Sequence, residues 1–483
     1  MSAAEPQTLT AALAALAARK VSSVELTEAA IARATAAQPR LNAFISFEPD
    51  LALAAARAAD QTRARAGAVQ GATQGGMQGG MQGALLGIPL AHKDMFYRAG
   101  KVVTCGSRIR RDWRAGSTST ALARLAEAGA LHLGTLNLAE FAFSPTGHNV
   151  HFGDCCNPWN PAYITGGSSS GSAAAVAEGI VFGALGSDTG GSIRLPAALC
   201  GVSGIKPTYG RVSRAGAMPL SHSLDHVGPI ARSVADCAHL LQAIAGEDRA
   251  DPTASTRAVP DLIAALGGRI GGWRIGMAQG YFDRDLAPAI ANALDEAARV
   301  FGSLGARLVP VHMPPLDAIN AAGTTMMWSE AASAHHAWLA ERAQEYGAQV
   351  RSRLEHGTAI TAIQYLRALK LRGPALDDFC RRVFGECDLL LVPTHDQPAP
   401  TRADTDLADR PEAAAVLGAL TRLTRPFNYL GLPTVSLPAG FDGNGLPIGL
   451  QLVGRPWAEA MLCTAGDAFQ QATDWHLRRP GVS

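Results

Sequence analysis

Residues 165–194, TGGSSSGSAAAVAEGIVFGALGSDTGGSIR, contain the pattern from which the fold can be predicted. Two loops rich in glycine and serine, 165–172 and 186–194, enclose a run of helix-forming alanines and a short apolar run. The order loop, helix, short strand, loop can bring both loops to one edge of a β-sheet. The stretch therefore predicts an α/β fold in which the two loops meet.

The second loop combines a serine with free backbone donors. Gly190 and Gly191 place no side chain directly before Ser192, so the N–H groups of this loop can point at one spot, as an oxyanion hole requires. Asp188 and Arg194 flank the serine, and we expect them to hold the loop through hydrogen bonds and an ion pair. A tight glycine turn without catalysis is the alternative for this loop taken alone.

The first loop has three competing interpretations. A phosphate cradle would need Gly-Lys-Ser/Thr or Rossmann spacing, and neither follows. Residues 167–171, GSSSG, match the G-x-S-x-G elbow with Ser169 as nucleophile, but chance matches are frequent in so biased a stretch, and residues 160–163 before it resemble a loop. The third interpretation is a serine relay that serves Ser192.

A serine nucleophile needs a base, and Lys93 is the strongest candidate. It ends the apolar, strand-like run 87–93, where burial lowers the pKa of a lysine and makes its neutral amine available. An ordinary strand-end lysine paired with Asp94 is the alternative. No acidic partner stands at a diagnostic spacing from the histidines near the loops, which are His92, His148, His151, His222 and His226.

Together these segments resemble the amidase signature family of serine hydrolases. The likeness rests on PLAHKD at 89–94, GGSSSGS at 166–172 and DTGGSIR at 188–194. Twenty-four positions separate Ser168 from Ser192, which is the family's spacing between relay and nucleophile. The likeness covers essentially the whole chain, is dense over 85–235 and weak over 260–380, and includes the further matches GIKPTYGRVS at 204–213, LDHVGP at 224–229 and LPIGLQLVG at 446–454.

The resemblance implies a role for each of these residues. Ser192 would attack a carbonyl, Ser168 would pass the proton, and Lys93 would act as base and then as acid for the leaving amine. Ser168 would be joined to Gly167 by a cis peptide, Ser169 would be a supporting hydrogen-bonding group, and water would release an acyl-enzyme. No metal or organic cofactor is implied, and the oxyanion hole would be formed by the N–H groups of Thr189, Gly190, Gly191 and Ser192.

The chain as a whole predicts one large α/β domain over 1–483, with a mixed, twisted sheet covered by helices on both faces. Thr8 and Ser22 or Ser23 are candidate helix N-caps. The expected segments are N-terminal helices at 1–65, a low-complexity loop at 66–84, the signature core at 85–235, a variable helical part at 260–380 and a return to the core sheet at 385–483.

Composition limits the partners. Lysine and arginine number 42 against 41 acidic residues, and no basic tract stands out, so we expect neither nucleic acid nor a membrane surface as partner. No apolar run reaches the roughly 18 residues of a membrane span, and no secretory leader is visible. Eight scattered cysteines without paired C-x-x-C motifs predict free thiols, no metal site and a cytoplasmic location.

The substrate is predicted from less specific features. Amidotransferase A-type subunits of this family usually carry an acid that reads the amino group of glutamine, and residues 421–433 contain none. We therefore expect an amidohydrolase that cleaves a small amide, anilide or carbamate with an apolar or aromatic group, acting alone or as a homodimer. Alternatives are an amidotransferase A-type subunit, a hydrolase of carbamates, urethanes or urea derivatives, and a catalytically silent binding protein. The expected pocket residues are Phe141, Phe143, Met326, Met327, Trp328 and Phe427.

Overall fold

The computed structural model describes residues 6–70, 83–408 and 410–481. Within them the chain forms a single α/β domain around one mixed sheet of eleven strands, in the order β1-β3-β2-β4-β6-β5-β10-β11-β9-β7-β8. The fold class is therefore confirmed. The strands are β1 (Phe44–Phe47), β2 (Pro89–Lys93), β3 (Leu131–Leu136), β4 (Gly183–Asp188), β5 (Ser203–Lys206), β6 (His226–Ala231), β7 (Arg274–Gln279), β8 (Arg307–His312), β9 (Leu389–Pro393), β10 (Thr434–Phe441) and β11 (Pro447–Val453).

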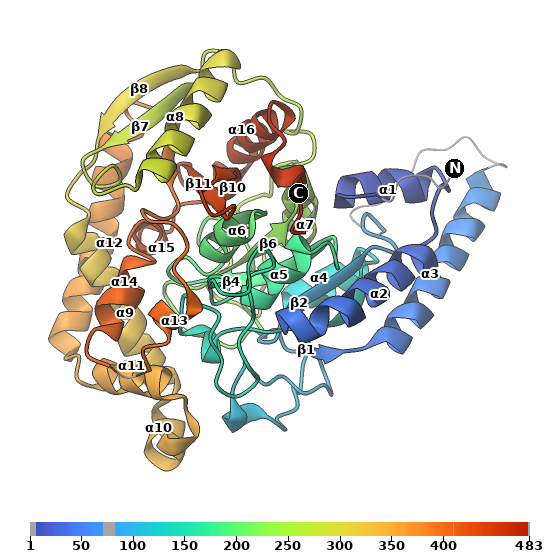
Figure 1. Ribbon diagram of the computed structural model, residues 1–483, viewed down its shortest axis with the longest axis horizontal. Helices are drawn as coiled ribbons and strands as arrows, with labels where there is room; N and C mark the ends of the chain where they lie inside the picture. Colours follow the sequence, from blue (N-terminus) through green and yellow to red (C-terminus); the bar gives the residue numbers. More distant parts are fainter. Residues whose placement is uncertain (1–5, 71–82, 409, 482–483) are drawn as a thin grey trace.

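Helices surround this sheet, with α1–α3 at one end and α9–α12 at the other (Figure 1). Thr8 and Ser22 cap the first two helices, as predicted. The α-helices are α1 (Leu9–Ala17), α2 (Ser23–Leu41), α3 (Pro49–Gln70), α4 (Thr120–Glu127), α5 (Ser170–Ala177), α6 (Arg194–Cys200), α7 (Val234–Ile244), α8 (Pro288–Ser303), α9 (Asp317–Ala334), α10 (His336–Arg342), α11 (Ala348–Thr358), α12 (Ala362–Arg382), α13 (Arg402–Thr405), α14 (Ala413–Ala419), α15 (Arg425–Tyr429) and α16 (Glu459–Gln471).

Neighbouring residues of one strand show that both faces of the sheet are covered. In β4, Ala184 packs in an apolar cluster with the alanines of α5, whereas Leu185 packs in another cluster with α7 and α16. Successive side chains of a strand point to opposite faces. The fully buried β4 therefore has helices on each side, which explains why its first four residues, 183–186, contain no polar side chain.

The position of the two Gly/Ser loops follows from one strand pairing. Strand β2 pairs in parallel with β4, through Ala91 with Ala184 and His92 with Leu185. Parallel neighbours end at the same edge of a sheet. Lys93, the last residue of β2, thus lies at the edge where β4 enters the second loop.

Three segments differ from the sequence prediction. Residues 44–47 form an edge strand, β1, within the part expected to be helical. Helix α3 extends to Gln70, past the expected start of the loop at 66, and residues 71–82 of that loop lie outside the described residues. Strands β7 and β8 lie in the part 260–380 and extend the same sheet, because β7 pairs with β9, which is more than a hundred residues away. The division of the domain into segments otherwise stays a prediction.

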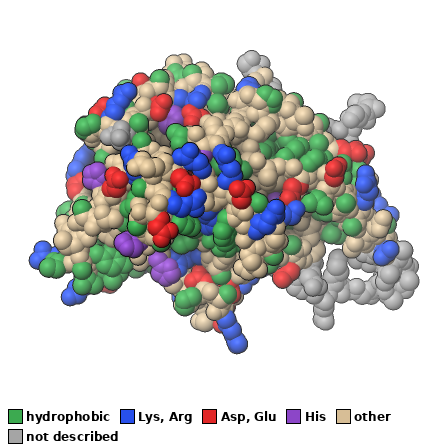
Figure 2. All heavy atoms as spheres, turned by 90° about the horizontal axis from the view of Figure 1, so that it is seen from below, with side chains coloured by type: hydrophobic (Ala, Val, Ile, Leu, Met, Phe, Trp, Pro, Cys, Tyr) green, Lys and Arg blue, Asp and Glu red, His purple; other side chains and the backbone are tan. Residues whose placement is uncertain are grey.

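The surface carries both signs of charge, in keeping with a formal net charge of +1. On the face in Figure 2, acidic and basic side chains are interspersed. None of the helices in the described part of the chain is long and apolar enough to cross a membrane.

Candidate active site

The two Gly/Ser loops are joined by direct hydrogen bonds. The N–H of Ser169 donates to the carbonyl oxygen of Ser192 at 3.3 Å. The Oγ of Ser169 lies 3.3 Å from both the N and the O of Ser187, the residue before Asp188. Ser169 therefore holds one loop against the other, and its hydroxyl is engaged with the backbone of β4.

Lys93 lies between the two loops, almost fully buried. Its Nζ is 2.7 Å from the Oγ of Ser168 and 2.8 Å from the Oγ of Ser187. Burial lowers the pKa of Lys93 to about 7, although the negative charges of Asp225 and Asp188 act to raise it. A neutral amine is thus accessible near neutral pH, in contact with a serine hydroxyl.

The alternative in which Lys93 pairs with Asp94 is wrong. Asp94 accepts hydrogen bonds from the N–H and the hydroxyl of Thr104, and burial raises its pKa to about 6. A second buried lysine, Lys206, is not equivalent to Lys93, because its Nζ donates to the carbonyl oxygens of Leu432 and Pro207. Of these two lysines, Lys93 has the serine contacts that a proton relay needs.

The peptide bond between Gly167 and Ser168 is cis, as the family resemblance implies. Ser168 is fully buried, and its carbonyl oxygen accepts a hydrogen bond from the N–H of Ala139 at 3.2 Å. Ser192, in contrast, lies at the wall of a cavity. The Ser168 side chain is therefore shielded from solvent, whereas Ser192 is accessible from the cavity.

The backbone of the second loop differs at one position from the expected oxyanion hole. The N–H of Gly191 donates to Oδ1 of Asp188 at 2.8 Å, and Gly191 is absent from the cavity wall. Thr189, Gly190 and Ser192 line the cavity. Three of the four expected donors thus remain available for an oxyanion.

Gly191 must be glycine for a steric reason. Its φ is +140°, and a Cβ there would lie 2.3 Å from the Oγ1 of Thr424. The same Thr424 hydroxyl donates to the carbonyl oxygen of Gly190 at 2.5 Å. The peptide between Gly190 and Gly191 is therefore fixed at its oxygen by Thr424 and at its nitrogen by Asp188.

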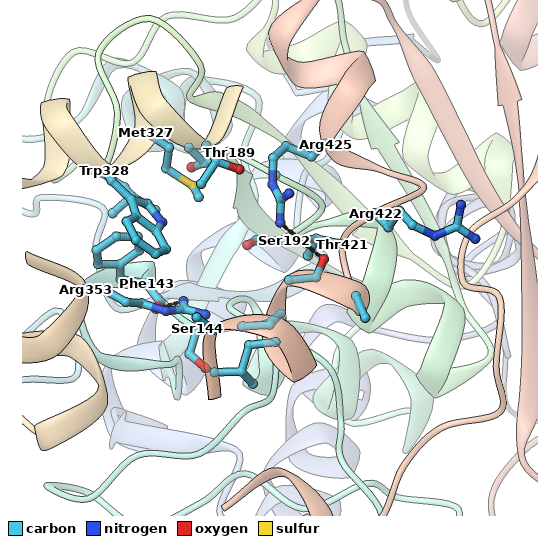
Figure 3. Close-up of a pocket in the computed structure, with 18 of the residues that line it drawn as sticks. Phe143, Ser144, Thr189, Ser192, Met327, Trp328, Arg353, Thr421, Arg422 and Arg425 are labelled. Carbon is cyan, nitrogen blue, oxygen red and sulfur yellow. Dashed lines mark hydrogen bonds between the residues drawn. The ribbon is translucent and has the colours of Figure 1, made fainter. Parts of the chain in front are cut away.

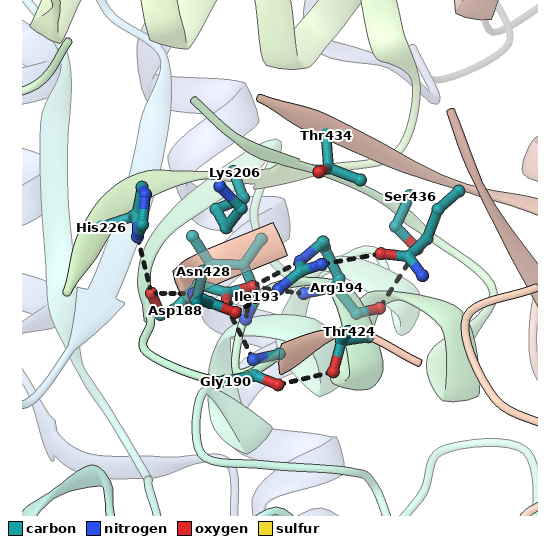
Figure 4. A network of polar contacts seen from close by, with 12 residues as sticks. Asp188, Gly190, Ile193, Arg194, Lys206, His226, Thr424, Asn428, Thr434 and Ser436 are labelled. Atoms are coloured by element: carbon teal, nitrogen blue, oxygen red, sulfur yellow. Dashed lines mark hydrogen bonds and ion pairs between the residues drawn. The ribbon is translucent and has the colours of Figure 1, made fainter. Parts of the chain in front are cut away.

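Asp188 and Arg194 form a fully buried ion pair (Figure 4). Nε and one terminal nitrogen of Arg194 each lie 3.0 Å from Asp188, and Asn428 donates to Asp188 at 2.8 Å. Arg194 also donates to Gln451 at 2.7 Å. Burial acts to raise the pKa of Asp188, but the charge of Arg194 outweighs it and holds that pKa below its usual value. The charge on each partner is compensated.

A cavity of about 390 Å³ opens beside Ser192. Its walls come from the Ser192 loop, the segment 142–145, helices α9 and α11 and the segment 414–425 (Figure 3). The size lies within the usual range for small-molecule sites. No group of His, Cys, Asp or Glu within the described ranges could hold a metal ion.

Comparison with known proteins matches this arrangement to a family. A family model described as Amidase matches residues 25–463. The chain belongs to the amidase family. Members of this family are hydrolases or amidotransferases that act on carbon–nitrogen bonds. This chain is therefore an enzyme that acts on carbon–nitrogen bonds, as the resemblance predicted.

Individual relatives of this amidase indicate a narrower group. It is 42% identical to the A subunit of glutamyl-tRNA(Gln) amidotransferase from Chloroflexus aurantiacus, over 98% of both chains. The solved A subunit of the same enzyme from Thermotoga maritima is 30% identical, with a TM-score of 0.81 and complete coverage of both chains. A solved chain of a vestigial protein complex, related to the origins of an s-triazine catabolic enzyme, is 34% identical, with a TM-score of 0.87 over 96% of this amidase and 98% of that chain.

These relatives correct the expected function and the expected partners. The prediction of a hydrolase that acts on small apolar or aromatic amides, alone or as a homodimer, is wrong. The similar full-length relatives are amidotransferase subunits. Those relatives are named as subunits of a larger enzyme, which contradicts the expectation of a chain that acts alone or as a homodimer. The absence of an acid from 421–433 does not exclude an amidotransferase subunit, since one local difference cannot outweigh a likeness that extends over the whole chain.

The cavity of the amidase contains only half of the predicted pocket residues. Phe143, Met327 and Trp328 line it. Met326 and Phe427 are fully buried in an apolar core cluster, where Phe427 stacks on Phe282 with centroids 5.5 Å apart. Phe141 packs against His335, Trp338 and Tyr346. These three are core residues, which removes much of the basis for an aromatic substrate.

Sequence reasoning missed the polar part of this wall. Arg353 of α11 and Arg425 at the start of α15 line the cavity, together with Asn320 and Thr421. Thr421 and Arg425 belong to the segment 421–433, which lacks the glutamine-reading acid of amidotransferase subunits. Nothing in the local sequence distinguishes these two residues from surface residues. Ser187, the second partner of Lys93, was also missed, although it directly precedes Asp188 in the second loop.

Proposed function

We propose that this chain is the amide-cleaving A-type subunit of a multi-subunit amidotransferase, in which Ser192, Ser168 and Lys93 release ammonia from a primary amide. The observation that carries the proposal is the contact of Lys93 Nζ with Ser168 Oγ at 2.7 Å, at the edge of the sheet where the Ser192 loop opens on a cavity. Full-length similarity to A-type amidotransferase subunits supports the multi-subunit context.

The reaction begins with the neutral amine of Lys93. It takes a proton from Ser168, which takes the proton of Ser192, and the Oγ of Ser192 then attacks the amide carbon. The pKa of about 7 suits Lys93 to this work, because a general base is most effective when its pKa lies near the working pH. A second contact of the Nζ, with the Oγ of Ser187, holds the amine beside Ser168.

The tetrahedral intermediate places a negative charge on the former carbonyl oxygen. The N–H groups of Thr189, Gly190 and Ser192 stabilise that charge, in a loop held rigid by Asp188 and Thr424. The proton on Lys93 returns through Ser168 to the amide nitrogen, and the C–N bond breaks. Ammonia leaves, an ester between Ser192 and the acyl group remains, and water hydrolyses it.

Release of ammonia from primary amides tests the catalytic part of this proposal. The purified full-length chain should produce ammonia, and added hydroxylamine should yield the hydroxamate of the acyl group, because it intercepts an acyl-enzyme. Ser192→Ala and Lys93→Ala should each lose at least about a thousandfold in kcat/KM. Full activity of Ser192→Ala with loss in Ser169→Ala would instead identify Ser169 as the nucleophile.

Assembly tests the partner. The chain would replace the A-type chain when the Chloroflexus aurantiacus amidotransferase is reconstituted, with that organism's own A-type chain as the matched control. We expect co-elution with the remaining subunits in size-exclusion chromatography. Elution of this chain alone, under conditions in which the control assembles, would contradict the partner while leaving the amide cleavage intact.

A further inference from the structure

Two arginines of the cavity wall, Arg353 and Arg425, have no acidic partner among the residues that the structure describes. Neither forms an ion pair there, whereas the third arginine of the wall, Arg422, lies 2.7 Å from Asp396. Figure 3 shows the Arg425 guanidinium beside Thr421 and Ser192, with Arg422 pointing away. We call Arg353 and Arg425 the cationic wall.

Arg425 is only 7% exposed, and its hydrogen bonds go to neutral groups. It donates to Oδ1 of Asn320 at 2.7 Å, to the Thr421 hydroxyl and to the carbonyl oxygen of Gly418 at 3.4 Å. Its Nε has no hydrogen-bond partner. Burial lowers its pKa to about 10, which leaves it charged at neutral pH. Arg425 therefore brings a full positive charge to the wall of the cavity.

Arg353 reaches the cavity from helix α11. It donates to the carbonyl oxygen of Phe143 at 2.6 Å and lies over the Phe143 ring, with its guanidinium carbon 5.4 Å from the ring centroid. Burial, together with the positive charge of Arg425, lowers its pKa to about 10. Both guanidinium groups therefore place positive charge on the wall of the same cavity.

No Asp or Glu lies on the described wall of this cavity. Acids nearby are already engaged: Asp396 pairs with Arg422, and Glu330 accepts hydrogen bonds from Ser221, Ser223 and Tyr365. Charges buried without a counter-ion are costly, and such a site binds an anion favourably and repels a cation. A ligand that carries a carboxylate would supply the missing negative charge, and a guanidinium can hold it in a bidentate manner.

We propose that the amide cleaved at Ser192 carries a carboxylate on its acyl part and no ammonium, as in the monoamide of a dicarboxylic acid. The carboxylate binds the cationic wall while the amide carbonyl faces Ser192. This inference rests on the proposed function and narrows its amide donor. An α-amino acid amide such as glutamine fits less well, because its ammonium would meet Arg353 and Arg425 with no acid to receive it.

Three amides with the same five-carbon skeleton test the inference. Glutaramate has the carboxylate alone, L-glutamine adds the ammonium, and pentanamide has neither charge. With the full-length chain we expect kcat/KM for glutaramate to exceed that for each of the other two by at least tenfold. Equal values, or a higher value for glutamine or pentanamide, would overturn the inference.

Substitutions of Arg353 and Arg425 test whether the cationic wall causes the preference for glutaramate over pentanamide. Arg353→Gln and Arg425→Gln should each lower the ratio of kcat/KM for glutaramate over pentanamide by at least tenfold, while hydrolysis of pentanamide reports an intact catalytic apparatus. Arg351→Gln is the matched control, because Arg351 lies on the same helix and contacts Glu355 and Gln344 instead. An unchanged ratio in both wall variants would overturn the inference.

Binding separates this inference from the proposed function. Calorimetry on Ser192→Ala, which does not turn over, should show glutaramate binding at least tenfold more tightly than glutamine or pentanamide. If no amide is cleaved by the wild type but this order holds, the proposed function fails and the anion site stands. If amides are cleaved without this order in binding or kcat/KM, the anion site fails and the amide cleavage stands.

Discussion

Arg194 and Arg425 are both buried near Ser192, yet their surroundings are opposite. Arg194 is paired with Asp188 and has its remaining donors on Asn428 and Gln451. Arg425 contacts neutral groups and keeps an unused Nε. The difference teaches how a buried charge can be interpreted: a compensated pair stabilises a loop, whereas an uncompensated charge at a cavity indicates a ligand of opposite sign.

Removal of the Asp188 charge should have the largest effect on stability. Asp188→Asn leaves Arg194 charged in the interior and should lower the free energy of unfolding by about 3–5 kcal/mol. Urea denaturation followed by tryptophan fluorescence measures it. Asp377→Asn, which breaks an exposed pair with Arg381, is the control and should cost less than about 1 kcal/mol. Equal losses would mean that burial does not distinguish the two pairs.

Binding of an anion at the cationic wall should give the second largest change in the free energy of unfolding. Glutarate at 100 times its Kd should raise the free energy of unfolding by about 2.7 kcal/mol, because it binds only the folded chain. The shift should disappear in the double variant Arg353→Gln, Arg425→Gln, and pentanamide should give none in either protein. A thermal shift that persists in the double variant would place the anion elsewhere.

The pH dependence of catalysis should follow Lys93. Its pKa of about 7 lies below the usual lysine value, so the base is neutral above pH 7 and protonated below it. The value of kcat/KM should therefore fall tenfold for each pH unit below about 7, which is about 1.4 kcal/mol per unit. A pH–rate profile between pH 5 and 9 measures it. A flat profile through pH 7 would contradict Lys93 as the base.

The smallest effect is expected for Arg425→Gln on stability. This substitution removes a charge without a partner and retains a polar side chain, so the free energy of unfolding should change by no more than about 1 kcal/mol. Arg194→Gln is the matched comparison and should lose several times more, because it leaves Asp188 unpaired. Similar losses of unfolding free energy in both variants would mean that the acidic partner of Arg194 makes no difference to stability.

The sequence was sufficient to predict the features that depend on residues close together in the chain. The capping residues Thr8 and Ser22 and the contact between the two Gly/Ser loops are confirmed, because each depends on neighbours in the chain or on a fixed spacing. Lys93 lies beside Ser168, and its role as the base stays a prediction. Strand β1 was missed, since its four residues become a strand only by pairing with β3, some ninety positions away. Strands β7 and β8 were missed for the same reason.

The amidase family was thus determined by the sequence alone, whereas the catalytic roles of Lys93 and Ser192 stay predictions. The composition of the cavity was decided by tertiary structure. Met326 lies in the core and the adjacent Met327 lines the cavity, and Arg425 faces the cavity while Phe427, two residues later, is buried in the core. The physical reason is that residue type sets what a side chain can do, whereas only the packing of α9, α11 and α15 around the sheet sets which way it points.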